Sequence, residues 1–464
     1  MEVQNYVLPP KKKKRLVIEY IYKIFVFLMM VGIFSFVWVR FYTPFNMAGN
    51  ILDQTIKLCF MACVYSGVYY IFGKFYKAYR LGAYRTTELM YYHFLTMAVT
   101  NVLFFLEGSI YKHRILNVLP ILGMFFVQWC VLTIVTLLFN RWMAKACELR
   151  KILIVYGSED YKEFQKKVEK KKNKFQILGI VDQKIGIEEI RKKMAGCTAI
   201  YLYEVNDDIR SELVLYCTQY NIDLYTTRNI EDIIVMGYET SHTFDTPFVR
   251  TRKEKIKVYY PFVKRMTDIL FSLFGLIVMS PILLIVAVII KLYDGGPVFY
   301  RQVRLTKNHK EFYIYKFRSM VVNAEKDGVA RLASQKDNRI TPVGKVIRAT
   351  RIDEFPQLFN VLKGDMSIVG PRPERPEIEK QYLEEIPEFG LRLQVKAGLT
   401  GYAQIFGKYN TTPLDKLKLD LIYINQQSFL MDIKLILWTV KIMFIPESTE
   451  GIEDSEVTAM KKKA

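Results

Sequence analysis

The sequence predicts a membrane protein of the α plus α/β class with three parts. These are a four-helix transmembrane bundle over residues 1–147, a small α/β domain over residues 148–250, and a second α/β domain over residues 251–464, held at one membrane face by a re-entrant helix-hairpin at 262–291. Two observations support this division. Long apolar runs fill most of the N-terminal third of the chain. The rest shows two regions of alternating strand and helix patterns, and one apolar run that contains a proline lies between these two regions.

The composition of the 464 residues excludes disorder and indicates an anionic partner. Hydrophobic residues make up 51% and aromatic residues 14%. Lysine and arginine outnumber aspartate and glutamate by 66 to 46, which gives a net charge of +20. This positive charge indicates that the protein binds nucleic acid, anionic lipid or a phosphorylated substrate. The long apolar runs exclude a soluble protein that binds nucleic acid. The six cysteines and four histidines show no paired spacing, so we expect neither a zinc site nor a disulfide framework.

Four apolar runs in the N-terminal part approach the length needed to span a membrane. They are Leu16–Val39, Ile56–Gly73, Tyr91–Tyr111 and Val118–Phe139. Basic residues precede the first run, separate the second from the third and follow the fourth, so the positive-inside rule places both ends in the cytoplasm. The runs contain almost no charged pairs, which favours an anchor over a transporter. We expect no cleaved signal peptide, because the first run lacks a small-residue cleavage site.

The central part predicts a small, degenerate Rossmann-like domain. Strands are expected at Ile152–Tyr156, Ile177–Val181, Ala199–Tyr203 and Ile222–Tyr225, and helices at Glu159–Lys172 and Ile209–Tyr220. Gly157 stands alone where the dinucleotide-binding turn has three glycines, and Glu159 and Asp160 follow where a pyrophosphate would approach. We therefore expect a docking or regulatory module without bound NAD, which contributes to self-association as a homodimer.

A membrane element of another kind is predicted at Ile269–Ile290. This apolar run is long enough to span, yet basic residues flank it on both sides, as expected for an element that enters and leaves on one side. At its centre, Pro281 removes a helical hydrogen bond, and the hydroxyl of Ser280 can satisfy a freed carbonyl. We predict a helix-hairpin broken at these two residues, with a kinked fifth span as the alternative.

Arginines are concentrated between Arg301 and Arg375, and their planar side chains suit phosphate oxygens. Strand alternation places Lys316 and Arg318 on one face, where they are candidate phosphate-binding residues. The alternative is a solvated basic face against lipid headgroups. No nucleic-acid motif accompanies these residues, so no nucleic-acid partner is expected.

An adjacent pair of acidic residues, Asp353 and Glu354, is the sharpest local feature. Pro356 fits the first turn of a helix that ends at Gly364, which predicts the pair at the helix N-terminus, where the dipole favours an ionised carboxylate. With Arg348 nearby, an ionised Asp353 could act as a nucleophile or bind a metal ion. The alternative is an ordinary acidic helix cap.

From about residue 259 to 444 the sequence resembles the bacterial sugar transferases, the monotopic polyprenyl-phosphate phosphoglycosyl transferases. The matching segments are Lys316-Phe317-Arg318-Ser319-Met320, Asp353-Glu354-Phe355-Pro356-Gln357-Leu358, Asn360-Val361-Leu362-Lys363-Gly364-Asp365-Met366-Ser367 and Gly370-Pro371-Arg372-Pro373. Two prolines bracket Arg372 and fix the backbone around it. The preceding spans and degenerate domain resemble the large members, which initiate capsule and exopolysaccharide synthesis. Arg351-Ile352 departs from the common Ser-Leu and leaves the acidic pair intact.

The resemblance implies a mechanism and its participants. Asp353 would attack the β-phosphate of a UDP-hexose, release UMP and form a phosphosugar–aspartyl intermediate, which the phosphate of undecaprenyl phosphate would then attack. Mg²⁺ would lie beside Asp353, Glu354 would assist the metal or the acceptor, and Lys316, Arg348 and Arg372 would hold phosphate oxygens. The catalytic domain would lie at the cytoplasmic face of the bacterial inner membrane, with UDP-glucose or UDP-galactose as the donor.

Two other functions compete with this one. A membrane-bound nucleotide-sugar dehydratase or epimerase would need the NAD-binding glycines that the central part lacks. A non-enzymatic assembly or regulatory protein would not need the acidic pair, which is present.

Overall fold

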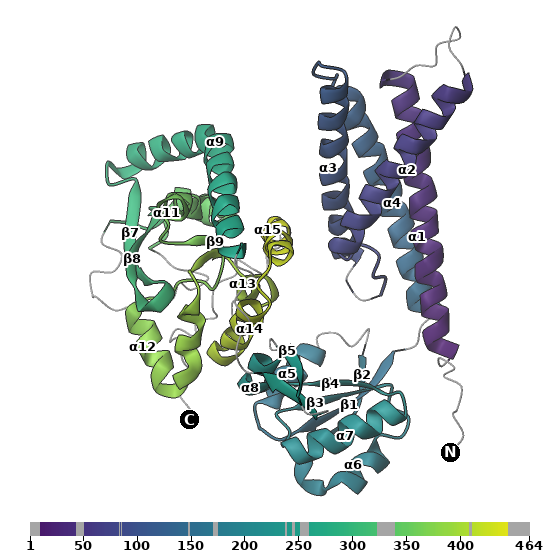
Figure 1. The fold of residues 1–464 in the computed structure, drawn as a ribbon, viewed down its shortest axis with the longest axis vertical. Coiled ribbons are helices and arrows are strands. Elements are labelled where there is room, and N and C mark those ends of the chain that lie inside the picture. Colours follow the sequence, from purple (N-terminus) through teal and green to yellow (C-terminus); the bar gives the residue numbers. More distant parts are fainter. Residues whose placement is uncertain are drawn as a thin grey trace. The chain divides into compact units, whose positions relative to one another are not determined.

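A computed structural model gives the fold of the chain (Figure 1). It describes residues 10–42, 51–82, 84, 86–146, 149–169, 175–236, 239–243, 246–250, 259–322, 339–407 and 411–443. The predicted domain limits near residues 147 and 251, and part of the basic flank before the predicted hairpin, lie outside the described residues. The chain forms two compact units, Met1–Thr227 and Arg228–Ala464.

The first unit begins with four long apolar helices, as the sequence predicts. They are α1 (Pro10–Val37), α2 (Ile51–Phe75), α3 (Thr86–Tyr111) and α4 (Leu119–Ala146), and a π-helical turn, η1 (Trp38–Tyr42), extends α1. Helix α1 packs against α2 and α4, and α3 packs against the same two helices. All four are long and apolar enough to cross a membrane.

Buried polar side chains join these helices to one another. The Tyr22 hydroxyl lies 2.7 Å from His93 Nε2 and 2.8 Å from Thr136 Oγ1, which connects α1, α3 and α4. Tyr65 on α2 donates to Asn101 Oδ1 on α3 at 2.6 Å. Polar side chains in apolar surroundings find partners on neighbouring helices, so these contacts favour one arrangement of the four.

Four parallel strands follow in the spatial order β2-β1-β3-β4. The elements are β1 (Arg150–Tyr156), α5 (Tyr161–Glu169), β2 (Phe175–Asp182), η2 (Gln183–Ile185), α6 (Ile187–Lys193), β3 (Ala199–Tyr203), α7 (Asp207–Gln219) and β4 (Asp223–Thr226). The predicted strands are confirmed, and so is the helix in α7. The short helix α6 was not predicted, because its charged sequence has little apolar periodicity.

Gly157 follows β1 at the point where the strand order reverses, which is where doubly wound sheets bind ligands. The Gly157 amide donates to Tyr203 O at 3.0 Å, and a Cβ on residue 157 would collide with the carbonyl oxygen of Glu204. The backbone of the β3–α7 loop thus packs directly on this turn. This close approach accounts for a glycine here by packing alone.

The second unit begins with α8 (Ile230–Val235), which packs on α14 (Pro413–Asn425); Asn425 Nδ2 donates to Ile233 O at 2.9 Å. An antiparallel hairpin of β5 (Glu239–Thr243) and β6 (Thr246–Arg250) follows, which was not predicted.

The remaining elements of this unit form a mostly helical α/β fold. They are α9 (Tyr260–Asp294), β7 (Phe299–Leu305), η3 (Lys307–His309), β8 (Glu311–Phe317), α10 (Pro342–Ala349), η4 (Ile352–Glu354), α11 (Gln357–Lys363), β9 (Ser367–Val369), α12 (Pro376–Glu385), η5 (Pro387–Gln394), β10 (Gly398–Thr400), α13 (Tyr402–Phe406), α14 and α15 (Phe429–Met443). Strands β7 and β8 pair antiparallel, and β9 and β10 pair parallel. Side chains of β8, α11, β9 and α14 share one hydrophobic core.

Helix α9 corrects one sequence prediction. The chain stays helical through Pro281, so the helix is not broken there as predicted. Ser280 Oγ donates to Ile277 O at 2.8 Å. This carbonyl would otherwise lack a partner, because proline has no N–H to donate to it. Figure 1 shows α9 turning sharply into two arms.

Both arms of α9 pack on the second unit. Gly275, before Pro281, lies against the Leu358 side chain of α11. Val286 and Ile290, after Pro281, share a buried cluster with Phe317 of β8. The helix is long and apolar enough to cross a membrane, and much of its surface is exposed.

Candidate active site

The acidic pair lies in its own 3-10 turn, η4, ahead of helix α11. Arg351 enters this turn in the left-handed conformation, with φ of 54°. The prediction that the pair starts the helix is off by one turn, since Pro356 caps α11. The helix dipole acts mainly within the first turn of a helix. Neighbouring charges therefore have more influence on the two carboxylates than the dipole does.

Glu354 is held by two cations from distant segments. Its Oε1 accepts hydrogen bonds from Lys316 Nζ on β8, at 3.1 Å, and from Arg372 Nη2, at 2.9 Å. Burial alone would raise the pKa of Glu354, but the charges of Arg372, Lys316 and Arg351 outweigh it and hold the pKa well below its usual value. Glu354 is therefore a permanent carboxylate at neutral pH.

Asp353 differs from its neighbour in both contacts and pKa. Its side chain is buried, with 8% exposed, and no side chain among the described residues donates a hydrogen bond to its carboxylate. Burial and the charge of Glu354 raise the pKa of Asp353 to about 6, although Lys316 and Arg348 oppose the rise. Asp353 is mostly ionised at pH 7, and none of the cations in the described part of the chain is bonded to it. Such a carboxylate is available for bonding to a substrate.

The other predicted phosphate-binding residues separate into two groups. Arg348, in the last turn of α10, lies close enough to lower the pKa of Asp353, and Lys316 bonds to Glu354 directly. Arg318 is buried after the end of β8 and forms an ion pair with Asp294 at the end of α9. Its observed partner is thus the end of the apolar helix rather than the acidic pair.

The loop that carries Arg372 is fixed by contacts that the sequence did not reveal. Gly398 N donates to Pro371 O at 2.8 Å, and a Cβ on Gly370 would collide with the chain at Lys396. Arg392 Nη2 donates to Arg372 O at 2.8 Å. Arg392 is buried and pairs with Asp420. Arg392 lies outside the recognised motifs, and only the folded chain shows that it supports the site.

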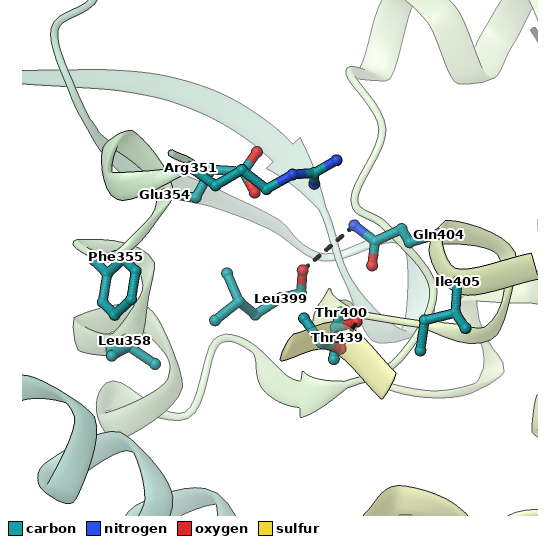
Figure 2. A pocket seen from close by; sticks show the side chains of 9 residues that line it. All are labelled: Arg351, Glu354, Phe355, Leu358, Leu399, Thr400, Gln404, Ile405 and Thr439. Atoms are coloured by element: carbon teal, nitrogen blue, oxygen red, sulfur yellow. Dashed lines mark hydrogen bonds between the residues drawn. The ribbon is translucent and has the colours of Figure 1, made fainter. Parts of the chain in front are cut away.

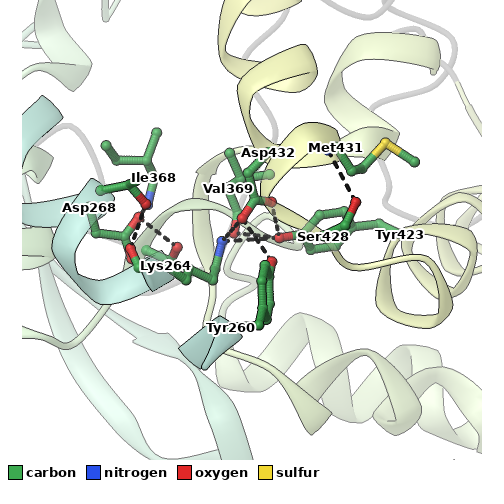
Figure 3. Close-up of polar contacts among 11 residues, drawn as sticks. Tyr260, Lys264, Asp268, Ile368, Val369, Tyr423, Ser428, Met431 and Asp432 are labelled. Atoms are coloured by element: carbon green, nitrogen blue, oxygen red, sulfur yellow. Dashed lines mark hydrogen bonds and ion pairs between the residues drawn. The ribbon is translucent and has the colours of Figure 1, made fainter. Parts of the chain in front are cut away.

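Helix α9 also supports the Arg372 loop, because it is hydrogen-bonded to β9, the strand that precedes this loop (Figure 3). Asp268 accepts hydrogen bonds from Ser367 Oγ and Ile368 N, both at 3.0 Å. Asp432 of α15 accepts hydrogen bonds from Lys264, Tyr260 and Tyr423.

The opposite side of the site is attached to the same helix. Arg265 Nη1 and Nη2 donate to the carbonyls of Val361 and Leu362 at the end of α11, each at 2.7 Å. The first turns of α9 thus connect to both β9 and α11. The Arg372 loop follows β9, and the acidic turn precedes α11, so both sides of the site have the same support.

A largely apolar pocket opens beside the acidic pair (Figure 2). Its empty volume is about 630 Å³, which includes solvent at its mouth. The lining residues are Arg351, Glu354, Phe355, Leu358, Leu399, Thr400, Gln404, Ile405 and Thr439. Charged groups thus lie at one side of the pocket, and apolar side chains form much of the rest.

The described residues contain no cluster of three side chains of the kinds that bind metal ions. Magnesium in a phosphoryl-transfer site needs only one or two carboxylates, because substrate phosphates and water supply the other ligands. Asp353 fits this role, since its carboxylate has no bonded donor among the described residues. Glu354 fits it less well, because one of its oxygens already accepts from two cations.

Fold and site define a class of protein in which several helices are long enough to cross a membrane and a buried carboxylate lies among cations. Residues 259–446 match the model of the bacterial sugar transferase family. The uncharacterized sugar transferase EpsL of Bacillus subtilis is 39% identical over 198 residues, which cover 42% of this chain and 94% of that protein. The chain belongs to the bacterial sugar transferase family.

Longer relatives match over a smaller share of their length. The UDP-N-acetylgalactosamine-undecaprenyl-phosphate N-acetylgalactosaminephosphotransferase of Aeromonas hydrophila is 38% identical over 242 residues, 51% of this chain and 56% of the relative. The UDP-glucose:undecaprenyl-phosphate glucose-1-phosphate transferase of Klebsiella pneumoniae is 45% identical over 190 residues, 40% of this chain and 41% of the relative. The chain thus spans about half the length of these relatives.

Proposed function

We propose that this chain transfers a sugar 1-phosphate from a UDP-hexose to undecaprenyl phosphate through a covalent intermediate on Asp353. First, a carboxylate oxygen of Asp353 bonds to the β-phosphorus of the donor, the bond to the bridging oxygen breaks, and UMP leaves with that oxygen. Then a phosphate oxygen of undecaprenyl phosphate bonds to the same phosphorus, and Asp353 is released as a carboxylate. The product is an undecaprenyl diphosphate sugar.

The contrast within the acidic pair carries this proposal. Glu354 is neutralised by Lys316 and Arg372, whereas Asp353 is buried and has no bonded donor among the described residues. Among the described residues, Asp353 is the member of the pair whose carboxylate bonds to neither cation, which leaves both of its oxygens available to phosphorus. Glu354 instead fixes two cations next to it, where they can neutralise the charge that develops on the transferred phosphoryl group.

The remaining charged residues bind and orient the donor. Arg372 and Lys316 are positioned by Glu354, and Arg348 adds a third positive charge near Asp353. Asp353 would also hold Mg²⁺, which when bound shields the charge of the donor phosphates. The names of the relatives, which specify N-acetylgalactosamine and glucose donors with undecaprenyl phosphate, support the same reaction. They do not favour a dehydratase or epimerase.

For the membrane topology we propose that α1 to α4 form a four-span anchor, with both ends in the cytoplasm, and that α9 is re-entrant. Two observations support a re-entrant α9: both of its arms pack on the same unit, and Ser280 compensates for the lost hydrogen bond at Pro281. The active site would then face the cytoplasm at the inner membrane. A homodimer formed through the central domain belongs to the same proposal.

Asp353→Asn tests the nucleophile. Asparagine keeps the size of the side chain but cannot bond covalently to phosphorus in this way. The purified chain is mixed with UDP-glucose or UDP-galactose and Mg²⁺, without lipid acceptor, and its intact mass is measured together with released UMP. The wild type should gain one hexose phosphate and release an equal amount of UMP, while Asp353→Asn gains none.

Asp415→Asn is the matched control, because Asp415 is exposed at the start of α14 and lies outside the site. This variant should form the adduct at the wild-type rate. Turnover of Asp353→Asn near the wild-type rate would refute the covalent mechanism.

A further inference from the structure

The pocket beside Glu354 has features that a UDP-sugar does not need. Phe355 and Leu358 line one side, and Leu399 and Ile405 lie across from them (Figure 2). A UDP-sugar is polar along its whole length, apart from the face of its uracil ring. A wall formed largely by aliphatic side chains gains little from such a ligand, because burying polar groups without partners costs free energy.

The uncharged polar side chains of the wall largely form hydrogen bonds within the protein. Thr400 Oγ1 and Thr439 Oγ1 lie 2.6 Å apart, and the Thr439 hydroxyl donates to Leu435 O at 2.8 Å. Gln404 Nε2 donates to Leu399 O at 3.3 Å. These bonds leave few uncharged polar groups for a ligand, and the amide oxygen of Gln404 is one lining atom without a partner among the described residues.

The pocket also adjoins the long apolar helix α9. Leu358, which lines the pocket, packs against Gly275 of α9. The exposed surface of α9 carries many large apolar side chains. A ligand with an anionic head near Glu354 and an apolar chain could therefore extend from the charged site along this pocket toward lipid.

We infer that this pocket binds the first isoprene units of the lipid acceptor, with its phosphate at the charged end. The inference rests on the proposed function and adds the location of the acceptor chain. Burial of an apolar chain is favourable in proportion to the area removed from water. The pocket thus orders the acceptor so that its phosphate approaches the phosphosugar on Asp353.

Substitutions that fill the pocket test this inference in the full chain. Leu399→Trp and Ile405→Trp should raise the KM for undecaprenyl phosphate about tenfold or more, while the rate of adduct formation from UDP-sugar alone stays within about twofold of the wild type. Leu430→Trp, at an exposed position of α15, is the matched control and should change neither quantity. Leu399→Ala is a second variant that adds no bulk, and it should also weaken acceptor binding.

Adduct formation without acceptor shows in each variant that the donor site is folded. An unchanged acceptor KM in both tryptophan variants and in Leu399→Ala would overturn the inference. A raised KM for the donor, in these variants or in Gln404→Leu, would assign the pocket to the uracil or the sugar instead. If the wild type forms no adduct with any UDP-sugar, the proposed function fails, which is a separate result.

Discussion

Adduct formation should depend on pH in the neutral range, because the proposed nucleophile is a buried carboxyl. Burial and the charge of Glu354 raise the pKa of Asp353 from an ordinary 3.8 to about 6. Only the ionised form can attack phosphorus. With a pKa of about 6, roughly nine-tenths of Asp353 is ionised at pH 7 and roughly one-tenth at pH 5. The initial rate should therefore fall about tenfold between these values.

Two variants should move the midpoint of this profile in opposite directions. Glu354→Gln removes the negative charge that raises the pKa of Asp353, so its midpoint should fall by about one pH unit. Lys316→Met removes a positive charge that lowers this pKa, so its midpoint should rise by a similar amount. The assay is the initial rate of mass gain with UDP-sugar from pH 5 to 8, normalised for each variant because both also lose rate. A flat wild-type profile, or the same midpoint in both variants, would refute the assignment.

The same pKa makes an independent prediction for stability. Because the pKa of Asp353 is raised on folding, ionising this carboxyl costs stability, and the loss develops as pH rises from 3.8 toward 6. The full cost is at most about 3 kcal/mol above pH 6. Asp353→Asn should therefore unfold at a higher temperature than the wild type at pH 8, and the difference should shrink at pH 4. Equal stability at both pH values would show that Asp353 is not buried as a charge.

The remaining predictions concern the parts that support the site. Cysteines introduced at positions 267 and 307, in place of Thr267 and Lys307, should both react with an impermeant thiol reagent from the same side of sealed vesicles if α9 is re-entrant. Reaction from opposite sides would establish that α9 spans the membrane. Pro281→Ala should straighten α9 and lower activity, measured as turnover with both substrates. Gly157→Ala should destabilise the central domain by about 1–3 kcal/mol, seen as faster proteolysis there, while adduct formation is unchanged. Asp268→Ala leaves two buried donors near β9 without their acceptor, so it should slow adduct formation and lower stability by about 1–3 kcal/mol; wild-type rates would contradict this support.

Much of the fold was predictable because it is encoded in one-dimensional patterns. Long apolar runs predicted the helices α1 to α4 with ends at most seven residues from those observed, and short apolar runs predicted the strands β1 to β4. Apolar periodicity is a local property of a segment, so it can be read from the sequence without knowing which other segments pack against it. The hairpin of β5 and β6 and the short helix α6 were missed, because their sequences carry little such periodicity.

The identity of the site residues was likewise predictable from the sequence, whereas their hydrogen-bond partners and pKa values were not. Adjacent acids and a proline-bracketed arginine mark Asp353, Glu354 and Arg372 in the sequence. Nothing local says that Lys316 and Arg372 both bond to Glu354, or that the two carboxylates have pKa values shifted in opposite directions. Those differences arise from burial and from charges that distant segments bring together.

The sequence by itself determined the apolar helices, the order of the parts and the residue types available for chemistry. Tertiary structure alone decided that Arg318 pairs with Asp294, that Arg392 supports the Arg372 loop, and that an apolar pocket opens beside Glu354. The physical reason is that hydrogen bonds, ion pairs and desolvation depend on distances between segments far apart in the chain. Periodicity records which face of an element is buried, but it carries no information about the partner that buries it.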